Sequence, residues 1–278
     1  MNQFKPTRSF LKWAGNKYQI LDRIKEVLPK GNRLIEPFAG SGVVSLNTDY
    51  DKCLLADNNV DLINLFLILQ DMGVGFINYC RSFFTEENNA EVRFYGFRED
   101  FNSTMDTLRK VALFVYLNRH TYNGLCRYNS KGQFNTPFGR YKKPYFPEKE
   151  MLHFLNMSKK AVFKVADFRD TMKSAQPGDV VYCNPPYVPL SDTANFTGYS
   201  QGGFFLADQV ELAQLAQELA DRGVPVLISN HATEFTLNIY QAAEIKRLSV
   251  QRFISCNGAN RGKAEEVLAL FCPSEAAI

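Results

Sequence analysis

Short apolar runs alternate with helical patterns towards both ends of the chain. Five runs have the length and residue types of buried strands, at residues 33–38, 53–56, 161–166, 179–183 and 224–229. Two further runs, at 244–251 and 267–271, close the chain, and we expect them to pair as an antiparallel hairpin. This alternation of strands and helices is typical of an α/β sheet.

Helical spacing of apolar residues predicts helices between the strands. They cover about 60–71, 108–118 and 205–221. Residues 119–146 differ, because they are rich in Asn, Gly, Pro and basic residues and show no sustained period, as in structured loops. We therefore expect one sheet-forming domain, made of residues 1–59 and 148–278, with a mainly helical insert at 60–147.

The composition is that of an ordinary globular protein, with 278 residues, 45% of them hydrophobic. A net charge of +3 does not by itself indicate a nucleic-acid partner. The six cysteines contain no C-x-x-C pair and the three histidines do not cluster, so we expect no metal site. Because the first residues are polar, we expect no signal peptide, and because no apolar run is long enough to cross a bilayer, we expect no membrane span. The scattered thiols suit a reducing cytoplasm.

The first strand runs into a loop with glycines, Phe38-Ala39-Gly40-Ser41-Gly42. Glycine there lets backbone N–H groups approach a ligand, and Asp57 ends the next strand where doubly wound sheets place a carboxylate for ribose hydroxyls. Glu36 adds a carboxylate that could face a positive ligand group such as an amine or a sulfonium. A glycine turn beside a surface aspartate explains the same residues without a ligand.

Asp167 and Phe168 follow the strand at 161–166. By position, the carboxylate could accept a hydrogen bond from the exocyclic amine of an adenine while the ring packs on its face. The alternative is a helix N-cap followed by a core phenylalanine.

The most specific chemical motif is Asn184-Pro185-Pro186-Tyr187, directly after the strand at 179–183. The prolines fix the backbone and free a carbonyl from the ladder of the sheet. The side-chain oxygen of Asn184 and the carbonyl of Pro185 could accept both hydrogens of an exocyclic amine and draw its delocalised lone pair into a nucleophilic geometry. Tyr187 would stack on the base, a contact worth about 1–3 kcal/mol. A rigid strand-exit loop is the alternative.

Residues 119–143 carry basic and aromatic side chains and no acidic one. The basic residues are Arg119, Arg127, Lys131, Arg140, Lys142 and Lys143. The aromatic residues among them are Tyr122, Tyr128, Phe134, Phe138 and Tyr141. Basic groups neutralise phosphates, arginine can read guanine, and a flat ring can fill the gap left by a flipped base. The pattern favours DNA contact over a merely solvated loop.

With these motifs in this order, the chain resembles the Dam family of DNA adenine methyltransferases over nearly its whole length. It is also similar to the related restriction–modification adenine methyltransferases. Further matching motifs are Phe10-Leu11-Lys12-Trp13-Ala14-Gly15, Tyr116-Leu117-Asn118-Arg119, Tyr122-Asn123-Gly124-Leu125-Cys126-Arg127-Tyr128-Asn129, Pro137-Phe138-Gly139-Arg140-Tyr141-Lys142-Lys143-Pro144-Tyr145-Phe146, Thr193-Ala194-Asn195-Phe196-Thr197 and Ile228-Ser229-Asn230-His231.

The resemblance implies a Rossmann-like class I methyltransferase sheet. Residues 1–59 and 148–278 would bind S-adenosylmethionine and catalyse, and residues 60–147 would recognise the target. The implied reaction is methyl transfer to adenine N6 in double-stranded GATC DNA by base flipping. The implied enzyme is a monomer in a bacterial or phage-infected cytoplasm.

The resemblance and the motifs together assign residues to roles. The expected catalytic residues are Asn184, Pro185, Pro186 and Tyr187. The expected cofactor-binding residues are Trp13, Lys17, Glu36, Phe38, Gly40, Asp57, Asp167, Phe168 and Asn184. The expected DNA-binding residues are Lys12, Arg119, Tyr122, Asn123, Leu125, Arg127, Pro137, Arg140, Tyr141 and Lys142. Of these, Leu125, Arg127, Pro137 and Tyr141 would touch GATC bases, and Tyr122 and Asn123 would lie by the vacated adenine position.

Two positions depart from the family pattern. Asn16 and Asn184 stand where the family usually has Gly and Asp. Asn184 still accepts a hydrogen bond, but it lacks the charge of a carboxylate, and charge-assisted bonds are about twice as strong. One alternative is therefore a DNA-binding homologue with reduced or no activity. The chemistry of Asn184-Pro185-Pro186-Tyr187 alone would also permit a cytosine-N4 or RNA methyltransferase, but the basic insert argues against that alternative.

Two loops complete the interpretation. Residues 188–203 are rich in Ser, Thr, Asn and Gly, and we interpret them as a lid in which Asn195 and Phe196 close on substrate. Residues 257–263 form a hairpin loop that contacts phosphate or is only a turn.

Overall fold

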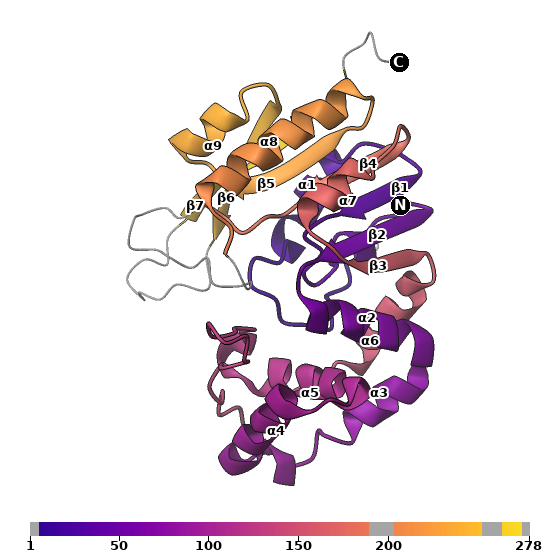
Figure 1. Cartoon of the computed structure of the whole chain (residues 1–278), viewed down its shortest axis with the longest axis vertical. Helices are drawn as coiled ribbons and strands as arrows, with labels where there is room; N and C mark the ends of the chain where they lie inside the picture. The colour runs from indigo at the N-terminus through magenta and orange to yellow at the C-terminus, as the bar shows by residue number, and fades with distance from the viewer. Residues whose placement is uncertain (1–5, 189–202, 252–262, 274–278) are drawn as a thin grey trace.

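A seven-stranded sheet forms the centre of the molecule (Figure 1). The computed structural model describes residues 6–188, 203–251 and 263–273. In these ranges the strand order is β3-β2-β1-β4-β5-β7-β6. The strands are β1 (Arg33–Glu36), β2 (Lys52–Asp57), β3 (Ala161–Val165), β4 (Asp179–Cys183), β5 (Val226–His231), β6 (Glu244–Gln251) and β7 (Lys263–Phe271). Strands β1 to β5 pair in parallel, whereas β7 runs antiparallel to β5 and β6, which confirms the expected Rossmann-like sheet and its C-terminal hairpin.

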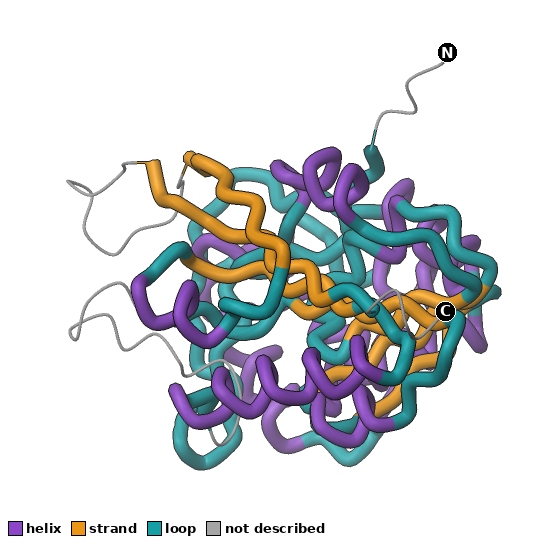
Figure 2. The backbone as a smooth tube through the Cα atoms, turned by 90° about the horizontal axis from the view of Figure 1, so that it is seen from above, coloured by secondary structure: helices purple, strands orange, loops and turns teal. Residues whose placement is uncertain are grey.

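Helices cover both faces of this sheet (Figure 2). They are α1 (Leu21–Val27), α2 (Val60–Met72), α3 (Val74–Arg81), α4 (Glu91–Ser103), α5 (Thr107–His120), α6 (Glu148–Ser158), α7 (Phe168–Lys173), α8 (Leu206–Asp221) and α9 (Glu234–Ile239). Short 3-10 turns lie at Tyr18–Ile20, Ser45–Asn47, Glu87–Asn89 and Tyr122–Gly124.

Successive residues of the central strands are buried in opposite layers. Leu34 packs in one hydrophobic cluster and Ile35 in the other, and Val180 and Val181 divide in the same way. Adjacent side chains of a strand point to opposite faces, so a strand covered on both sides is apolar throughout. This explains why the central strands are continuous apolar runs in the sequence.

Helices α2 to α5 extend away from the sheet (Figure 1). Their buried side chains, such as Phe66, Phe94 and Val115, belong to the same hydrophobic cluster as Leu34 and Leu55 of the sheet. Asn59 caps α2 and Asp106 caps α5 by accepting a backbone N–H three residues on. The expected mainly helical segment is therefore present, and it shares its core with one face of the sheet.

The structure also contains elements that the apolar pattern does not predict. Helix α4 has Gly96 in its interior and few buried residues, so its periodicity is weak. Strand β7 begins at Lys263 and not at residue 267, because its backbone pairs with β6 as far as Gln251 although three of these first four residues are charged. Pairing between backbones does not require an apolar side chain, and sequence periodicity does not detect it.

Some expectations concern parts of the chain that are not described. Asn195, Phe196 and residues 257–262 lie outside the described residues. Within the described ranges, no single helix is long and apolar enough to cross a bilayer. Helices α2 and α3 pass such a test only together, across a bend of 119°.

A buried carboxyl group lies at the end of β1. Glu36 is 2% exposed, and its Oε1 accepts hydrogen bonds from the backbone N–H of Ser45, at 2.9 Å, and from the Ser45 hydroxyl. Burial raises the pKa of Glu36 to about 7, although the two bonds from Ser45 oppose this shift. Glu36 therefore attaches the end of the glycine loop to the strand that precedes it.

This burial predicts a pH-dependent effect of Glu36→Gln on stability. The pKa of Glu36 is about 7 in the folded protein, above the ordinary 4.5, so the stability that its neutral carboxyl confers is fully present below pH 4.5. That stability is lost as the pH rises through about 7, because the buried carboxyl then ionises. The amide of the variant does not ionise. Between about pH 5 and pH 8 the free energy of unfolding should shift by about 1–3 kcal/mol in favour of the variant, as measured by urea denaturation. The exposed Glu218→Gln is the control, and the same shift in both variants would contradict the assignment.

Candidate active site

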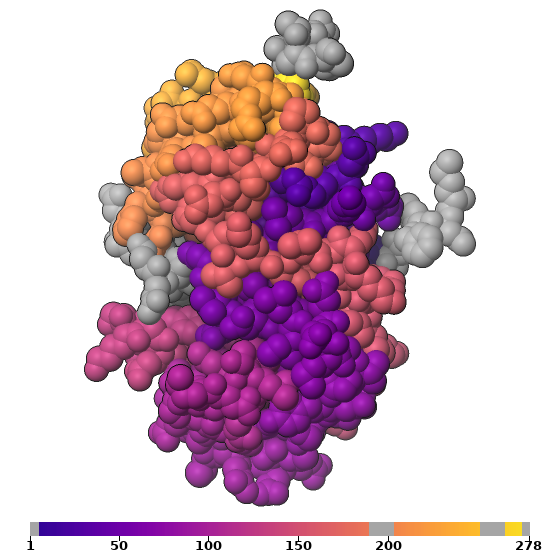
Figure 3. Space-filling model, turned by 45° about the vertical axis from the view of Figure 1, so that its right-hand side comes forward, coloured from indigo at the N-terminus to yellow at the C-terminus, as the bar shows by residue number. Residues whose placement is uncertain are grey.

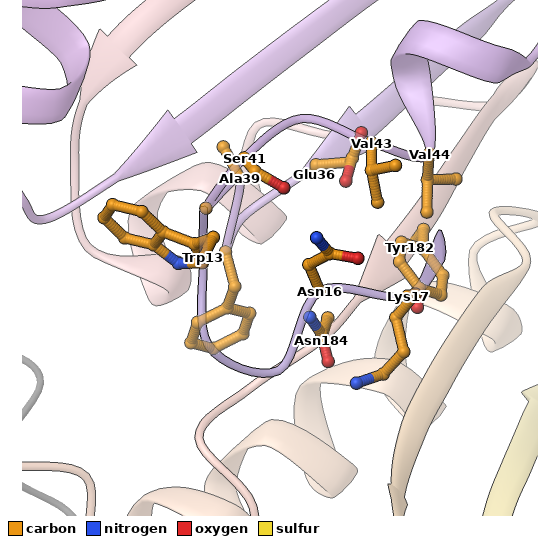
Figure 4. A pocket seen from close by; sticks show the side chains of 12 residues that line it. Trp13, Asn16, Lys17, Glu36, Ala39, Ser41, Val43, Val44, Tyr182 and Asn184 are labelled. Carbon is orange, nitrogen blue, oxygen red and sulfur yellow. The ribbon is translucent and has the colours of Figure 1, made fainter. Parts of the chain in front are cut away.

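A pocket lies where the carboxyl ends of β1 and β4 meet (Figure 4). It is lined by Trp13, Asn16, Lys17, Glu36, Phe38, Ala39, Gly40, Ser41, Val43, Val44, Tyr182 and Asn184. Chain order reverses between these neighbouring strands, and doubly wound sheets bind ligands at such a switch point. The pocket thus brings the predicted glycine loop, the N-terminal motif and the first residue of the tetrapeptide together.

The glycine loop approaches Trp13 closely. Gly40 has a φ of +47°, and a Cβ placed on it would lie 2.8 Å from Nε1 of the Trp13 indole. Its backbone N–H donates to Oδ2 of Asp57 at 3.0 Å, and Oδ1 of Asp57 accepts from the N–H of Asn59. Burial raises the pKa of Asp57, which these backbone hydrogen bonds oppose. Asp57 therefore ties the loop to the end of β2.

Asp167 and Phe168 lie outside the lining of the pocket. Asp167 caps α7 by accepting from the N–H of Arg169, whose guanidinium lies 4.4 Å from the Phe168 ring centre. Phe168 is buried and stacks with Phe38 at 5.3 Å between ring centres. The N-cap and core roles that the sequence left as the alternative are thus present, and Phe38 connects them to the pocket.

Lys17 is a buried cation at the edge of the pocket. Its Nζ donates to the carbonyl of Gly15 at 2.6 Å and lies 4.3 Å from the centre of the Tyr187 ring. Burial lowers its pKa to about 8, whereas nearby Glu266 acts in the opposite direction. Lys17 therefore connects the N-terminal motif to the end of the tetrapeptide.

Asn184 has hydrogen-bond partners for both ends of its amide. Nδ2 donates to the carbonyl of Gly15 at 3.2 Å, and Oδ1 accepts from the hydroxyl of Ser229 at 3.3 Å. Figure 4 shows its side chain beside Asn16, between Trp13 and Lys17. Asn16 itself does not have a positive φ, so the Gly-to-Asn departure requires no left-handed backbone there.

The rest of the tetrapeptide is held by residues to which the sequence analysis gave no role. Gln209 of α8 donates to the carbonyl of Pro186 at 2.7 Å. The hydroxyl of Tyr187 donates to Glu266 at 2.9 Å, and the ring packs edge-on against His231. Ser229, His231 and Glu266 lie at one end of the β5–β7 pair. The sequence contains a signal for these partners, because the polar residues Ser229-Asn230-His231 directly follow an apolar run and so mark the end of a buried strand.

The segment between α5 and α6, residues 121–147, forms a second candidate surface, and we call it the hairpin segment. It is coloured pink in Figure 3, where it protrudes from the body. Two isolated bridges, between Thr121 and Phe138 and between Tyr128 and Phe134, give it a hairpin form. The predicted DNA-binding residues that are exposed are Tyr122, Asn123, Arg127, Pro137, Arg140 and Lys142, and Lys12, Leu125 and Tyr141 are partly buried.

Arg119 differs from the other predicted DNA-binding residues. It is 8% exposed, and its guanidinium donates to the carbonyl of Phe10 in the N-terminal segment. Burial lowers its pKa to about 10. Arg119 thus connects the last turn of α5 to the N-terminal segment through a buried hydrogen bond. Charge alone did not reveal this, because a carbonyl partner far away in sequence leaves no local pattern.

Among the residues that the structure describes, no group of three or more His, Cys, Asp or Glu side chains could hold a metal ion.

Comparison with known proteins identifies the family. The model of the D12 class N6 adenine-specific DNA methyltransferases matches residues 13–254. The chain is 51% identical over 269 residues to the DNA adenine methylase of Escherichia coli K12, an alignment that covers 97% of each chain. It is 53% identical to the Serratia marcescens methylase, covering 96% of this chain and 99% of that one.

The DNA adenine methylase of Vibrio cholerae serotype O1 is 47% identical, over 97% of this chain and 98% of its own. Among solved structures, human methyltransferase 10 domain containing protein aligns with 93% of this chain and 82% of its own, at 9% identity and a TM-score of 0.40. The match to an adenine-specific family decides against the cytosine-N4 and RNA alternatives. The chain belongs to the D12 class N6 adenine-specific DNA methyltransferase family.

Proposed function

We propose that this methyltransferase transfers the methyl group of S-adenosylmethionine to adenine N6 of GATC in double-stranded DNA, and that the adenine leaves the helix to react. The observation that carries this proposal is the carbonyl of Gly15, which accepts from both Lys17 and Asn184. This carbonyl brings the N-terminal cofactor motif and the catalytic tetrapeptide to one point. A donor methyl and a target amine have to meet at such a point.

Lys17 and Gly40 of the pocket lining, and Asp57 bonded to Gly40, support S-adenosylmethionine as the ligand of this pocket. That compound supplies an electrophilic methyl group on a sulfonium. Lys17 offers a cation for its carboxylate, and Asp57 stands at the end of β2, where ribose hydroxyls bind in this type of sheet. Gly40 leaves no room for a Cβ beside Trp13, so the loop backbone faces the pocket without a side chain. Glu36 is engaged by Ser45, and we assign it to the support of this loop and not to the sulfonium.

The tetrapeptide fits an exocyclic amine. Oδ1 of Asn184 and the carbonyl of Pro185 would accept the two N6 hydrogens, and Tyr187 would stack on the adenine ring. Glu266, His231 and Lys17 hold Tyr187 from three directions. A ring fixed before the base arrives loses little conformational entropy on stacking. An adenine paired inside a duplex cannot reach this pocket, which is the reason for proposing base flipping.

The hairpin segment fits a role in reading DNA. Arg127 would read a guanine, together with Leu125, Pro137 and Tyr141 on neighbouring bases. Tyr122 is 55% exposed, and Asn123 has a left-handed φ of 54°, which presents both residues at the tip of a turn. They would occupy the space that the adenine vacates. Arg140 and Lys142 would bind phosphates. A monomer acting in the cytoplasm, where chromosomal DNA lies, completes the proposal.

A second candidate is a DNA-binding homologue with reduced activity. The observation that favours it is the engagement of Asn184, whose amide is already bonded at both ends. An amide also lacks the negative charge that would stabilise the amine as it becomes positive during methyl transfer.

Replacement of Asn184 by Asp tests both candidates. The carboxylate should strengthen the hydrogen bond to the reacting amine, so Asn184→Asp is expected to raise the methylation rate about five- to tenfold, the effect of roughly 1 kcal/mol. The rate is measured with tritiated S-adenosylmethionine on a GATC duplex under single-turnover conditions. A wild type without activity whose variant is active would support the second candidate.

Asn16→Asp is the matched control for Asn184→Asp. It adds the same charge to the same pocket, from a residue outside the tetrapeptide. Equal rates for the wild type and Asn184→Asp would show that the amide costs nothing. A rise of the same size in Asn16→Asp would assign the effect to the general field of the pocket.

Two substitutions in the hairpin segment separate base reading from phosphate binding. Arg127→Ala should relax specificity at one position by about 1–3 kcal/mol, seen as faster relative methylation of duplexes that differ from GATC at one base. Lys142→Ala should weaken binding to all duplexes alike. It should also reduce the slope of the logarithm of the binding constant against the logarithm of the salt concentration by about one. An unchanged order of preference among these duplexes for Arg127→Ala would exclude the base-reading role.

A further inference from the structure

Asn118, in the last turn of α5, joins two segments that are distant in sequence. It is 1% exposed, and its Oδ1 accepts the backbone N–H of Lys12 at 2.9 Å. Its Nδ2 donates to the carbonyl of Lys12 at 2.7 Å and to the carbonyl of Gly124 at 3.3 Å. The amide therefore pairs with Lys12 as a neighbouring strand would, and it binds the hairpin segment at the same time.

The side chain of Lys12 extends this junction towards the hairpin segment. Its Nζ lies 4.4 Å from the centre of the Tyr141 ring, whose hydroxyl accepts the N–H of Asn123 at 2.9 Å. Gly124 packs directly on Lys12, since a Cβ placed there would lie 2.5 Å from Cβ of Lys12. Lys12 thus contacts Tyr141, which we propose reads DNA, and Gly124, which follows the exposed turn at Tyr122 and Asn123.

The residue after Lys12 faces the other site. Trp13 lines the pocket and packs on Gly40 of the glycine loop. Because Lys12 and Trp13 share a peptide bond, a shift of the hairpin segment that moves Lys12 also moves the indole that borders the pocket. Asn118 holds the backbone at this point, and its buried amide would lose partners if the two segments moved apart.

We propose that Asn118 is a positioning residue that couples DNA binding at the hairpin segment to cofactor binding at Trp13 and Gly40. This inference rests on the proposed function, which supplies the two ligands. Coupling of this kind is reciprocal: DNA raises the affinity for the cofactor by the same factor as the cofactor raises the affinity for DNA.

The chain contains a matched control for Asn118. Asn102 of α4 accepts the N–H of Phe134 at 2.8 Å and donates to the carbonyl of Phe134 at 3.1 Å. Its amide makes the same two-point contact with one backbone residue of the hairpin segment. Both of these hydrogen bonds go to Phe134 and neither reaches the N-terminal segment, so Asn102 anchors the hairpin away from the connection to the pocket.

The test is a comparison of coupling factors in the full-length protein. The dissociation constant of a GATC duplex is measured by fluorescence anisotropy without and with saturating S-adenosylhomocysteine, in the wild type, Asn118→Asp and Asn102→Asp. We expect a wild-type ratio within the common range of about 5–150. Asn118→Asp should lower this ratio at least about threefold, and Asn102→Asp should leave it within about twofold while weakening DNA binding in both states. A general loss of stability would not change such a ratio.

The remaining outcomes are also decisive. A wild-type ratio of one, or equal ratios in the two variants, would overturn the role of Asn118 and leave the proposed function intact. A wild type that binds neither duplex nor S-adenosylhomocysteine would instead overturn the proposed function. If Asn118→Asp does not fold, Gly124→Ala displaces Lys12 from the opposite side and should lower the ratio in the same way, and an unchanged ratio there would reject the inference.

Discussion

The parallel pairing of β1 with β4 is the constraint on which the candidate site depends. Arg33, Leu34 and Ile35 align with Asp179, Val180 and Val181, and the guanidinium of Arg33 holds the Asp179 carboxylate at the start of both strands. The register fixed there determines where the strands end. Glu36 and Asn184 therefore reach the same pocket from distant parts of the sequence.

A second regularity concerns residues 6–17, the described part of the N-terminal segment. These residues contain no strand, so their carbonyl groups have no ladder partners. Side chains supply hydrogen-bond donors instead: Arg119 donates to Phe10, Asn118 to Lys12 and Asn184 to Gly15, and Lys17 of the segment itself also donates to Gly15. Polar side chains of α5, of the pocket and of the tetrapeptide therefore hold the backbone of this segment in place. The same segment contains Trp13, which lines the pocket. Long-range polar contacts thus position a part of the site that has no regular structure of its own.

These contacts explain which features could be predicted from the sequence. The strands, the glycine loop and the tetrapeptide were recognisable because apolar runs and residues of fixed geometry are local signals. The partner of a polar side chain is not a local signal. Glu36 has the charge to face a ligand, yet it bonds to Ser45, and Arg119 has the charge to bind phosphate, yet it bonds to Phe10. The apolar pattern does not predict helix α4 for a related reason, since Phe94 and Phe101 are its only buried residues and give no sustained apolar period.

The core that unites the sheet with helices α2 to α5 has a consequence for how such enzymes change their target. A recognition unit with its own core could be exchanged whole between relatives, as a cassette. Here the apolar side chains of α5 lie in the same cluster as those of β1 and β2. An insert transplanted from a relative would therefore have to pack against core residues of a sheet with which it did not evolve. If the segment between α5 and α6 reads DNA, as we propose, its exposed turns are where a replacement can alter sequence preference without disturbing the core that α5 shares with the sheet.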